Sequence, residues 1–137
     1  MAPWLDEIVQ LHDFFEAYFL GTVPESDLSR MDGVLAEGFT HLGPHGAVTD
    51  RSETLAAVRA GYAHTKQLKI TITEPTLLSG SEDLLVCRYI ENHELTAGTN
   101  HRWSTVAFEK DPTTPNGLSW VTVHETWVAN TRPSDEG

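Results

Sequence analysis

Cysteine and basic side chains are scarce in this sequence. Cys87 is its one cysteine, and nine Lys and Arg residues stand against 20 Asp and Glu, which gives a net charge of −11 at pH 7. A lone cysteine excludes an internal disulfide framework. Nucleic acids are bound through clustered Lys and Arg, so this balance argues against a nucleic-acid partner and against an anionic membrane surface. The acidic excess is typical of a protein kept soluble by its charge.

Long apolar runs and the signatures of common cofactor sites are also absent. No segment approaches the ~20 apolar residues of a membrane span, and the opening residues, Met-Ala-Pro-Trp-Leu-Asp-Glu, lack the basic segment of a secretory signal. The sequence has no His-Glu-x-x-His zinc motif, no glycine-rich phosphate loop and no Gly-x-Ser-x-Gly elbow. We therefore predict a cytoplasmic protein without metal or cofactor.

The first part of the chain shows helical periodicity. From Leu5 to Leu20, apolar residues recur at spacings of three and four, which predicts an amphipathic helix that ends at Gly21. The apolar stripe of the helix consists of Leu5, Ile8, Leu11, Phe15 and Phe19.

The length of the chain suits one domain, which we place at residues 1–129. The polar residues 130–137 are expected to form a disordered tail.

Two further helices are indicated by capping boxes. Thr22-Val-Pro-Glu25 predicts a helix through Leu35, and Asp50-Arg-Ser-Glu53 predicts one to about Tyr62. Between them, Phe39 to Leu42 has the character of a short strand.

The second half of the chain is predicted to be sheet. Alternating apolar and polar residues separated by Gly-, Pro- and Asn-rich turns indicate four long strands. Consecutive strands joined by turns pair antiparallel, so we predict an α+β fold in which three N-terminal helices pack on a mainly antiparallel sheet. The four strands are expected at residues 67–77, 84–95, 100–109 and 118–128.

Three segments in this order resemble the nuclear transport factor 2-like (cystatin-like) superfamily, over roughly Leu5 to Val128. Within it, the sequence is most similar to bacterial domain-of-unknown-function, SnoaL-like members and to the association domain of calcium/calmodulin-dependent kinase. The resemblance implies a strongly curved sheet wrapped around helices into a cone with a pocket. Members of the superfamily include isomerases, dehydratases and cyclases as well as non-catalytic binding domains, so the fold alone does not give the function. The segments are Phe39-Thr-His-Leu-Gly-Pro-His-Gly46 with Asp50-Arg51, Arg102-Trp-Ser-Thr-Val106, and Trp120-Val-Thr-Val-His-Glu-Thr-Trp127.

The comparison with ketosteroid isomerases fails residue by residue. The aspartate that serves as their general base corresponds to Gly43, and their second, oxyanion-binding aspartate would fall near Ser104. A glycine cannot accept a proton, so isomerase chemistry by that route is not expected. His41, next to the lost base, is the alternative proton acceptor. His45 lies in the adjoining turn, and the simpler interpretation is an exposed turn residue.

The same resemblance indicates which strand residues face the pocket. Arg102 and Glu125 are expected on its inner wall as a charge-assisted ion pair. The pair is either purely structural, or Glu125 holds Arg102 in place as the anchor of an acidic or carbonyl-bearing ligand. In the second case Ser104 could add a hydrogen bond to the ligand. A register slip of one residue would reverse every facing. The two inward sets are Arg102, Ser104, Val106 and Phe108 on one strand, and Val121, Val123, Glu125 and Trp127 on the next.

His12 lies within the apolar stripe of the first helix. It is either a buried core histidine with its hydrogen bond satisfied or, with Phe15 and Phe19, part of the pocket wall. We assign ligand-binding roles to Arg102, Ser104, His12, Phe15, Phe19 and Trp127, and catalytic roles to His41 and Glu125.

Large aromatic side chains are predicted on the outer, convex face of the sheet. Exposed contiguous apolar surface marks interfaces, so Trp103, Trp120 and His124 predict a sheet-to-sheet homodimer. Two functions remain open: a cofactor-independent lyase, isomerase or cyclase that works on a small molecule by acid-base chemistry, and a non-catalytic dimeric domain that binds a ligand or a protein.

Overall fold

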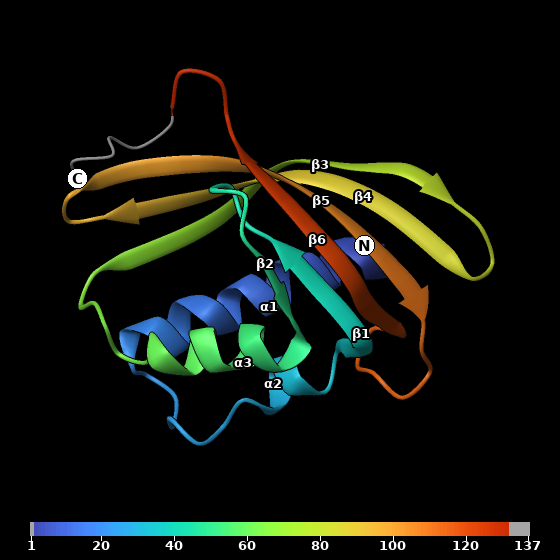
Figure 1. Cartoon of the computed structure of the whole chain (residues 1–137), viewed down its shortest axis with the longest axis horizontal. Coiled ribbons are helices and arrows are strands. Elements are labelled where there is room, and N and C mark those ends of the chain that lie inside the picture. The colour runs from blue at the N-terminus through green and yellow to red at the C-terminus, as the bar shows by residue number, and fades with distance from the viewer. Residues whose placement is uncertain (1, 132–137) are drawn as a thin grey trace.

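A six-stranded curved sheet with helices on one side forms the molecule, as the computed structural model of residues 2–131 shows (Figure 1). The predicted α+β class is confirmed, while residues 132–137 of the predicted tail lie outside the described residues. None of the described helices is both long and apolar enough to cross a membrane. The elements are α1 (Pro3–Leu20), α2 (Ser29–Asp32), β1 (Leu35–Leu42), β2 (Val48–Asp50), α3 (Arg51–Ala60), β3 (Leu68–Gly80), β4 (Leu84–Leu95), β5 (Gly98–Lys110) and β6 (Leu118–Trp127).

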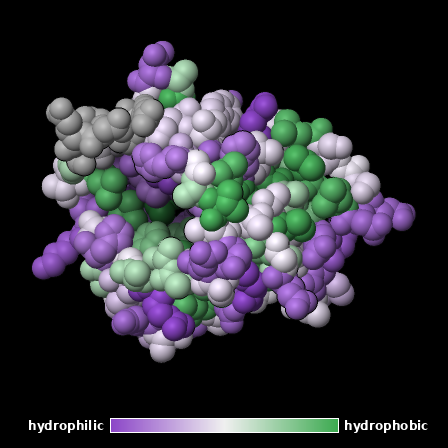
Figure 2. Space-filling model, in the orientation of Figure 1, coloured by the Kyte–Doolittle hydropathy of each residue, from purple (hydrophilic) through white to green (hydrophobic). Residues whose placement is uncertain are grey.

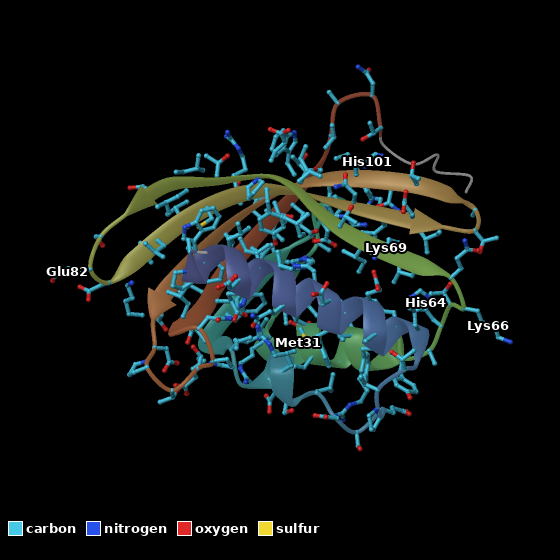
Figure 3. All side chains as sticks on the ribbon, turned by 180° about the vertical axis from the view of Figure 1, so that it is seen from behind. Met31, His64, Lys66, Lys69, Glu82 and His101 are labelled. Atoms are coloured by element: carbon cyan, nitrogen blue, oxygen red, sulfur yellow. The ribbon has the colours of Figure 1, made fainter. Side chains whose placement is uncertain are left out.

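The strands are ordered β2-β1-β6-β5-β4-β3. Neighbouring strands pair antiparallel except β1 and β6, which run parallel and join the N-terminal strands to the C-terminal meander. Helices α1 and α3 lie on the same side of this sheet in both ribbon views (Figures 1 and 3). Figure 3 places Met31 on that helical side and His101 on the opposite side. The pocket residues described below lie between these two layers.

Local signals account for the ends of α1 and α3. Gly21 follows α1 at a left-handed φ of 76° and donates its backbone N–H to the last turn of the helix. At α3, the Asp50 side chain accepts from the Glu53 N–H while the Glu53 side chain accepts from the Asp50 N–H, so the predicted second capping box is confirmed.

The helix predicted from Thr22 to Leu35 is wrong in extent. Only the four residues of α2 are helical, because the Thr22 hydroxyl donates back to the carbonyl of Ala17 in α1 instead of capping a new helix. The Asp27 carboxylate accepts hydrogen bonds from both the backbone N–H and the hydroxyl of Ser29, the first residue of α2. Strand β1 begins at Leu35, four residues before the predicted strand.

Trp120 lies in the core, which corrects its predicted place on the convex face. Its side chain is 1% exposed and packs at 4.6 Å, edge to face, against Phe108. The cause is a β-bulge: Ala107 pairs with Thr122 and Phe108 with Trp120, so Val121, predicted to face inward, is an extra residue without a partner on β5. The bulge turns both Trp120 and Glu125 to the inner face, which simple alternation forbids.

A buried carboxylate ties the helices to the sheet. Glu7 of α1 is fully buried and accepts two hydrogen bonds from the Arg30 guanidinium, at 3.1 and 2.8 Å. It also accepts from the indole Nε1 of Trp120 at 2.8 Å and from the Asn116 amide at 3.0 Å. Residues from α1, α2, β6 and the loop before β6 therefore meet at one charged group.

Candidate functional site

A pocket of about 450 Å³ lies between the helices and the inner face of the sheet. Figure 2 shows its hollow, with apolar residues around it, on the face toward the viewer. The volume falls within the usual range for small-molecule sites, and the walls are mainly apolar, as such sites require. The apolar lining residues are Leu11, Phe15, Phe19, Met31, Leu35, Phe39, Pro44, Ala47, Ala57, Val58, Trp120 and Val123.

The first polar group of the pocket is centred on Glu125. This carboxylate is 7% exposed, accepts a hydrogen bond from His41 Nε2 through one oxygen, and lies 3.5 Å from the Arg102 guanidinium through the other. Arg102 also donates to Asn100 at 3.0 Å and stacks on the Trp127 ring at 5.0 Å. These contacts hold the guanidinium against the sheet.

The second polar group is centred on Glu91 of β4. One oxygen of its carboxylate accepts from His12 Nε2 at 2.8 Å, and the other accepts from His93 Nε2 at 2.5 Å. Burial opposes the charged forms of both Glu91 and His12. The charge of His12 and the hydrogen bonds from the two histidines nevertheless hold the pKa of Glu91 well below its usual range. The same Glu91 charge raises the pKa of His12 above 6.5.

Tyr89 lines the pocket two residues before Glu91. Burial raises the pKa of its phenol well above 10, and the charges of Glu91 and Glu125 act in the same direction. The hydroxyl therefore stays protonated and is available as a hydrogen-bond donor to a ligand oxygen. Among residues 2–131, no group of three His, Cys, Asp or Glu side chains is placed to bind a metal ion.

Comparison with solved structures reveals the same architecture elsewhere. An NTF2-like protein of unknown function from Pseudomonas aeruginosa is 26% identical and superposes with a TM-score of 0.86, over 93% of this chain and all of that one. The chain belongs to the nuclear transport factor 2-like superfamily. An NTF2-like protein from Cytophaga hutchinsonii (11% identity, TM-score 0.67, 90% and 94% covered) and the CaMKII hub of S. rosetta (15%, 0.64, 90% and 95%) share the fold.

Sequence comparison gives this nuclear transport factor 2-like chain one further relative. It is 28% identical over 136 residues to sucrose-phosphatase 2 of Nicotiana tabacum. The match covers 94% of the chain but 32% of the tobacco protein, so the chain spans about a third of that relative's length. No model of a known protein family matches the sequence.

The structure brings six of the eight predicted site residues to the pocket lining: His12, Phe15, Phe19, His41, Arg102 and Glu125. Ser104 is fully buried and Trp127 is partly buried, and neither is among the lining residues. Trp127 instead contacts two lining residues: the Arg102 guanidinium lies over its ring, and the His45 ring makes a T-shaped contact with it at a centroid distance of 5.5 Å. The two interpretations of His12 both hold, because it is buried, hydrogen-bonded through both ring nitrogens, and part of the wall.

Two turn residues clarify the surroundings of His41. His45, interpreted from the sequence as an exposed turn residue, is part of the pocket lining. A β-carbon added at Gly43 would lie 3.4 Å from Cε1 of His41, so the imidazole stands beside the position that corresponds to the isomerase base.

Sequence reasoning missed Tyr89, Glu91 and His93. The signal was present, because these residues alternate along β4 and period-two spacing places them on one face of the sheet. The same spacing brings Nε2 of His93 to the carboxylate of Glu91, two residues before it.

Proposed function

We propose that this chain binds a mainly apolar small molecule and catalyses a cofactor-independent acid-base reaction on it, of the lyase, isomerase or cyclase kind. The observation that carries the proposal is a histidine in an apolar pocket, His41, bonded through one ring nitrogen to the buried carboxylate of Glu125. Histidine is the usual side chain for proton transfer near neutral pH.

The geometry gives each group a role. A carboxylate only accepts hydrogen bonds, so His41 carries its proton on Nε2 and keeps Nδ1, which no described residue contacts by a hydrogen bond, as the proton acceptor. Glu125 orients the ring and stabilises the imidazolium formed when a substrate proton arrives. Arg102 balances the charge of Glu125, and Tyr89 donates to a developing oxyanion.

His93 has the same construction as His41. Its Nε2 is bonded to Glu91, and no hydrogen bond to its Nδ1 occurs within the described part of the chain. The proposal therefore has two candidate bases, and single variants of each separate them.

The test begins with thermal unfolding against a panel of small ketones, alcohols and aromatic metabolites. A ligand at about 100 times its dissociation constant adds roughly 2.7 kcal/mol, enough to raise the midpoint by several degrees. For a hit that is turned over, His41→Ala should reduce kcat at least ~10-fold with an unchanged unfolding midpoint. His124→Ala is the matched control, since His124 is exposed and outside the pocket. Full activity in His41→Ala would discard the role of His41.

A second candidate function, a non-catalytic oligomeric domain, is favoured by the fold shared with the CaMKII hub. Leu77, Leu78 and Leu84 are 44–45% exposed where β3 meets β4, and green residues gather on that side of the molecule in Figure 2. Trp103, beneath Arg88 at 5.4 Å, belongs to the predicted dimer face. Light scattering tests this function: Trp103→Glu should give a monomer from a dimeric parent, whereas an unchanged mass would reject that face as the interface.

A further inference from the structure

The two carboxylates of the pocket share one arrangement. Glu125 lies between a cation, Arg102, and a histidine, His41. Glu91 likewise accepts hydrogen bonds from His12 and from His93. The four partners come from β1, β4, β5 and α1, so the pattern is a property of the folded site and not of one sequence motif.

Hydrogen-bond chemistry identifies His12 as the cation that accompanies Glu91. Its Nδ1 lies 2.7 Å from the carbonyl oxygen of Ile8, and a carbonyl only accepts, so Nδ1 carries a proton. Its Nε2 lies 2.8 Å from the Glu91 carboxylate and carries a proton for the same reason. His12 is therefore an imidazolium, in agreement with its raised pKa. His93 also donates its Nε2 proton to Glu91.

Each carboxylate of the lining is consequently paired with a cation. Glu91 and Glu125 contribute two negative charges, and His12 and Arg102 contribute two positive charges, each already engaged by a carboxylate. Lysine and aspartate are absent from the lining residues. A carboxylate or phosphate that entered would be desolvated beside two carboxylates, and each of the two lining cations already has one of these carboxylates as its partner, which makes the entry of an anion unfavourable. A sugar phosphate is excluded by the same reasoning.

We infer that the pocket selects an uncharged ligand, with an apolar body and one carbonyl or hydroxyl oxygen, and rejects anions of the same shape. This inference rests on the proposed function, because it describes the ligand of the same pocket. The sequence led us to expect that Arg102 anchors either an acidic or a carbonyl-bearing molecule. The inference keeps the carbonyl-bearing class and excludes the acidic one. The oxygen would be held by the Tyr89 hydroxyl, while the apolar body would lie against Phe15, Phe19 and Trp120.

A matched pair of fluorescent probes tests the inference. Prodan is a neutral naphthyl ketone, and 6-(dimethylamino)-2-naphthoate has the same ring system with a carboxylate in place of the ketone. Affinities are measured by fluorescence titration at 150 mM salt, where the Debye length of about 8 Å screens the surface charge of the protein. We expect Prodan to bind at least ~10-fold more tightly than the naphthoate, a difference of about 1.4 kcal/mol.

Removal of one pocket carboxylate should reverse the preference. Glu125→Gln leaves Arg102 without its carboxylate, so the naphthoate should gain at least ~10-fold in affinity while Prodan changes little. Glu91→Gln provides an independent second variant if the first is unstable. Glu109→Gln is the control, since it removes the same charge from an exposed residue of β5 outside the pocket and should leave both affinities unchanged.

The outcomes separate the two proposals. Equal or tighter binding of the naphthoate to the unmodified protein would overturn the inference and leave the small-molecule pocket standing. An equal gain of the naphthoate in Glu109→Gln would also overturn it, because total charge would then be the cause. If neither probe bound the protein or its pocket variants, the proposed function itself would fail.

Discussion

Replacement of Glu7 by alanine should destabilise the protein more than any surface substitution. Glu7 is fully buried and accepts hydrogen bonds from Arg30, Asn116 and Trp120. Its removal leaves the Trp120 indole N–H without an acceptor in the core, which costs about 1–3 kcal/mol. It also leaves the Arg30 guanidinium, 22% exposed, without its carboxylate. Breaking a buried ion pair by removal of one partner costs about 3–5 kcal/mol in total.

Part of the Arg30 contribution is recovered because this partly exposed side chain can turn to water, so we expect about 3 kcal/mol for Glu7→Ala. That is a large share of the roughly 5–15 kcal/mol by which domains are stable. At about 3.5 °C per kcal/mol, as the usual unfolding entropy per residue gives for a chain of 137 residues, the unfolding midpoint should fall by around 10 °C.

The assay is urea unfolding followed by tryptophan fluorescence, with the free energy of unfolding taken from the midpoint and slope. Glu7→Gln is the matched control: it preserves the volume and one acceptor oxygen but points an amide N–H₂ at other donors, so about half the loss is expected. Arg30→Met in the Glu7→Ala background should be less destabilising than in the unmodified protein, because the charge that it removes is already unpaired. A loss below ~1 kcal/mol in Glu7→Ala would refute the view that this carboxylate organises the core.

Three further predictions concern other parts of the fold. Because Cys87 is fully buried and burial raises its pKa to about 11, the folded protein should resist thiol labelling at pH 8, and rapid labelling would contradict this. Gly21→Ala should lower the free energy of unfolding in urea by about 2 kcal/mol, because φ is 76° there and the new β-carbon would lie 2.7 Å from another side chain. Gly46→Ala should lose less, since φ is 90° but the space around it is open. The pKa of His12 is raised in the folded state, so protonated His12 stabilises the fold fully below pH 6.5, and this stabilisation is lost as the pH rises through the folded pKa. Above pH 6.5, the urea midpoint should therefore decline less with rising pH in His12→Gln than in the unmodified protein.

Periodicity and turn chemistry predicted the fold class and most of the elements. Strand β4 occupies the residues expected, Leu84 to Leu95, because alternation and flanking turns both identify it. The helix expected after Thr22 failed because a capping box is a local pattern, whereas the Thr22 hydroxyl bonds to α1 in the folded chain. Local signals do not reveal which of two partners a side chain takes.

The candidate site was predicted in part. The facing of Arg102 and Glu125 was obtained from the superfamily resemblance, and both line the pocket. Trp120 was placed on the wrong face because the bulge at Val121 shifts the alternation by one residue, and nothing in the composition of β6 marks it. The pairing of Glu91 with His12 is beyond sequence reasoning of this kind, since the two residues are 79 positions apart.

The parallel pairing of β1 with β6 has a consequence for how the site assembles in time. The bond between His41 and Glu125 closes 84 residues of chain, whereas β3, β4 and β5 are joined by short turns and can pair early. Contacts between distant parts of a chain pay a large loop-closure entropy and form slowly. A partly folded chain in which only the meander had formed would lack the His41–Glu125 pair, so ligand binding would report the joining of β1 to β6.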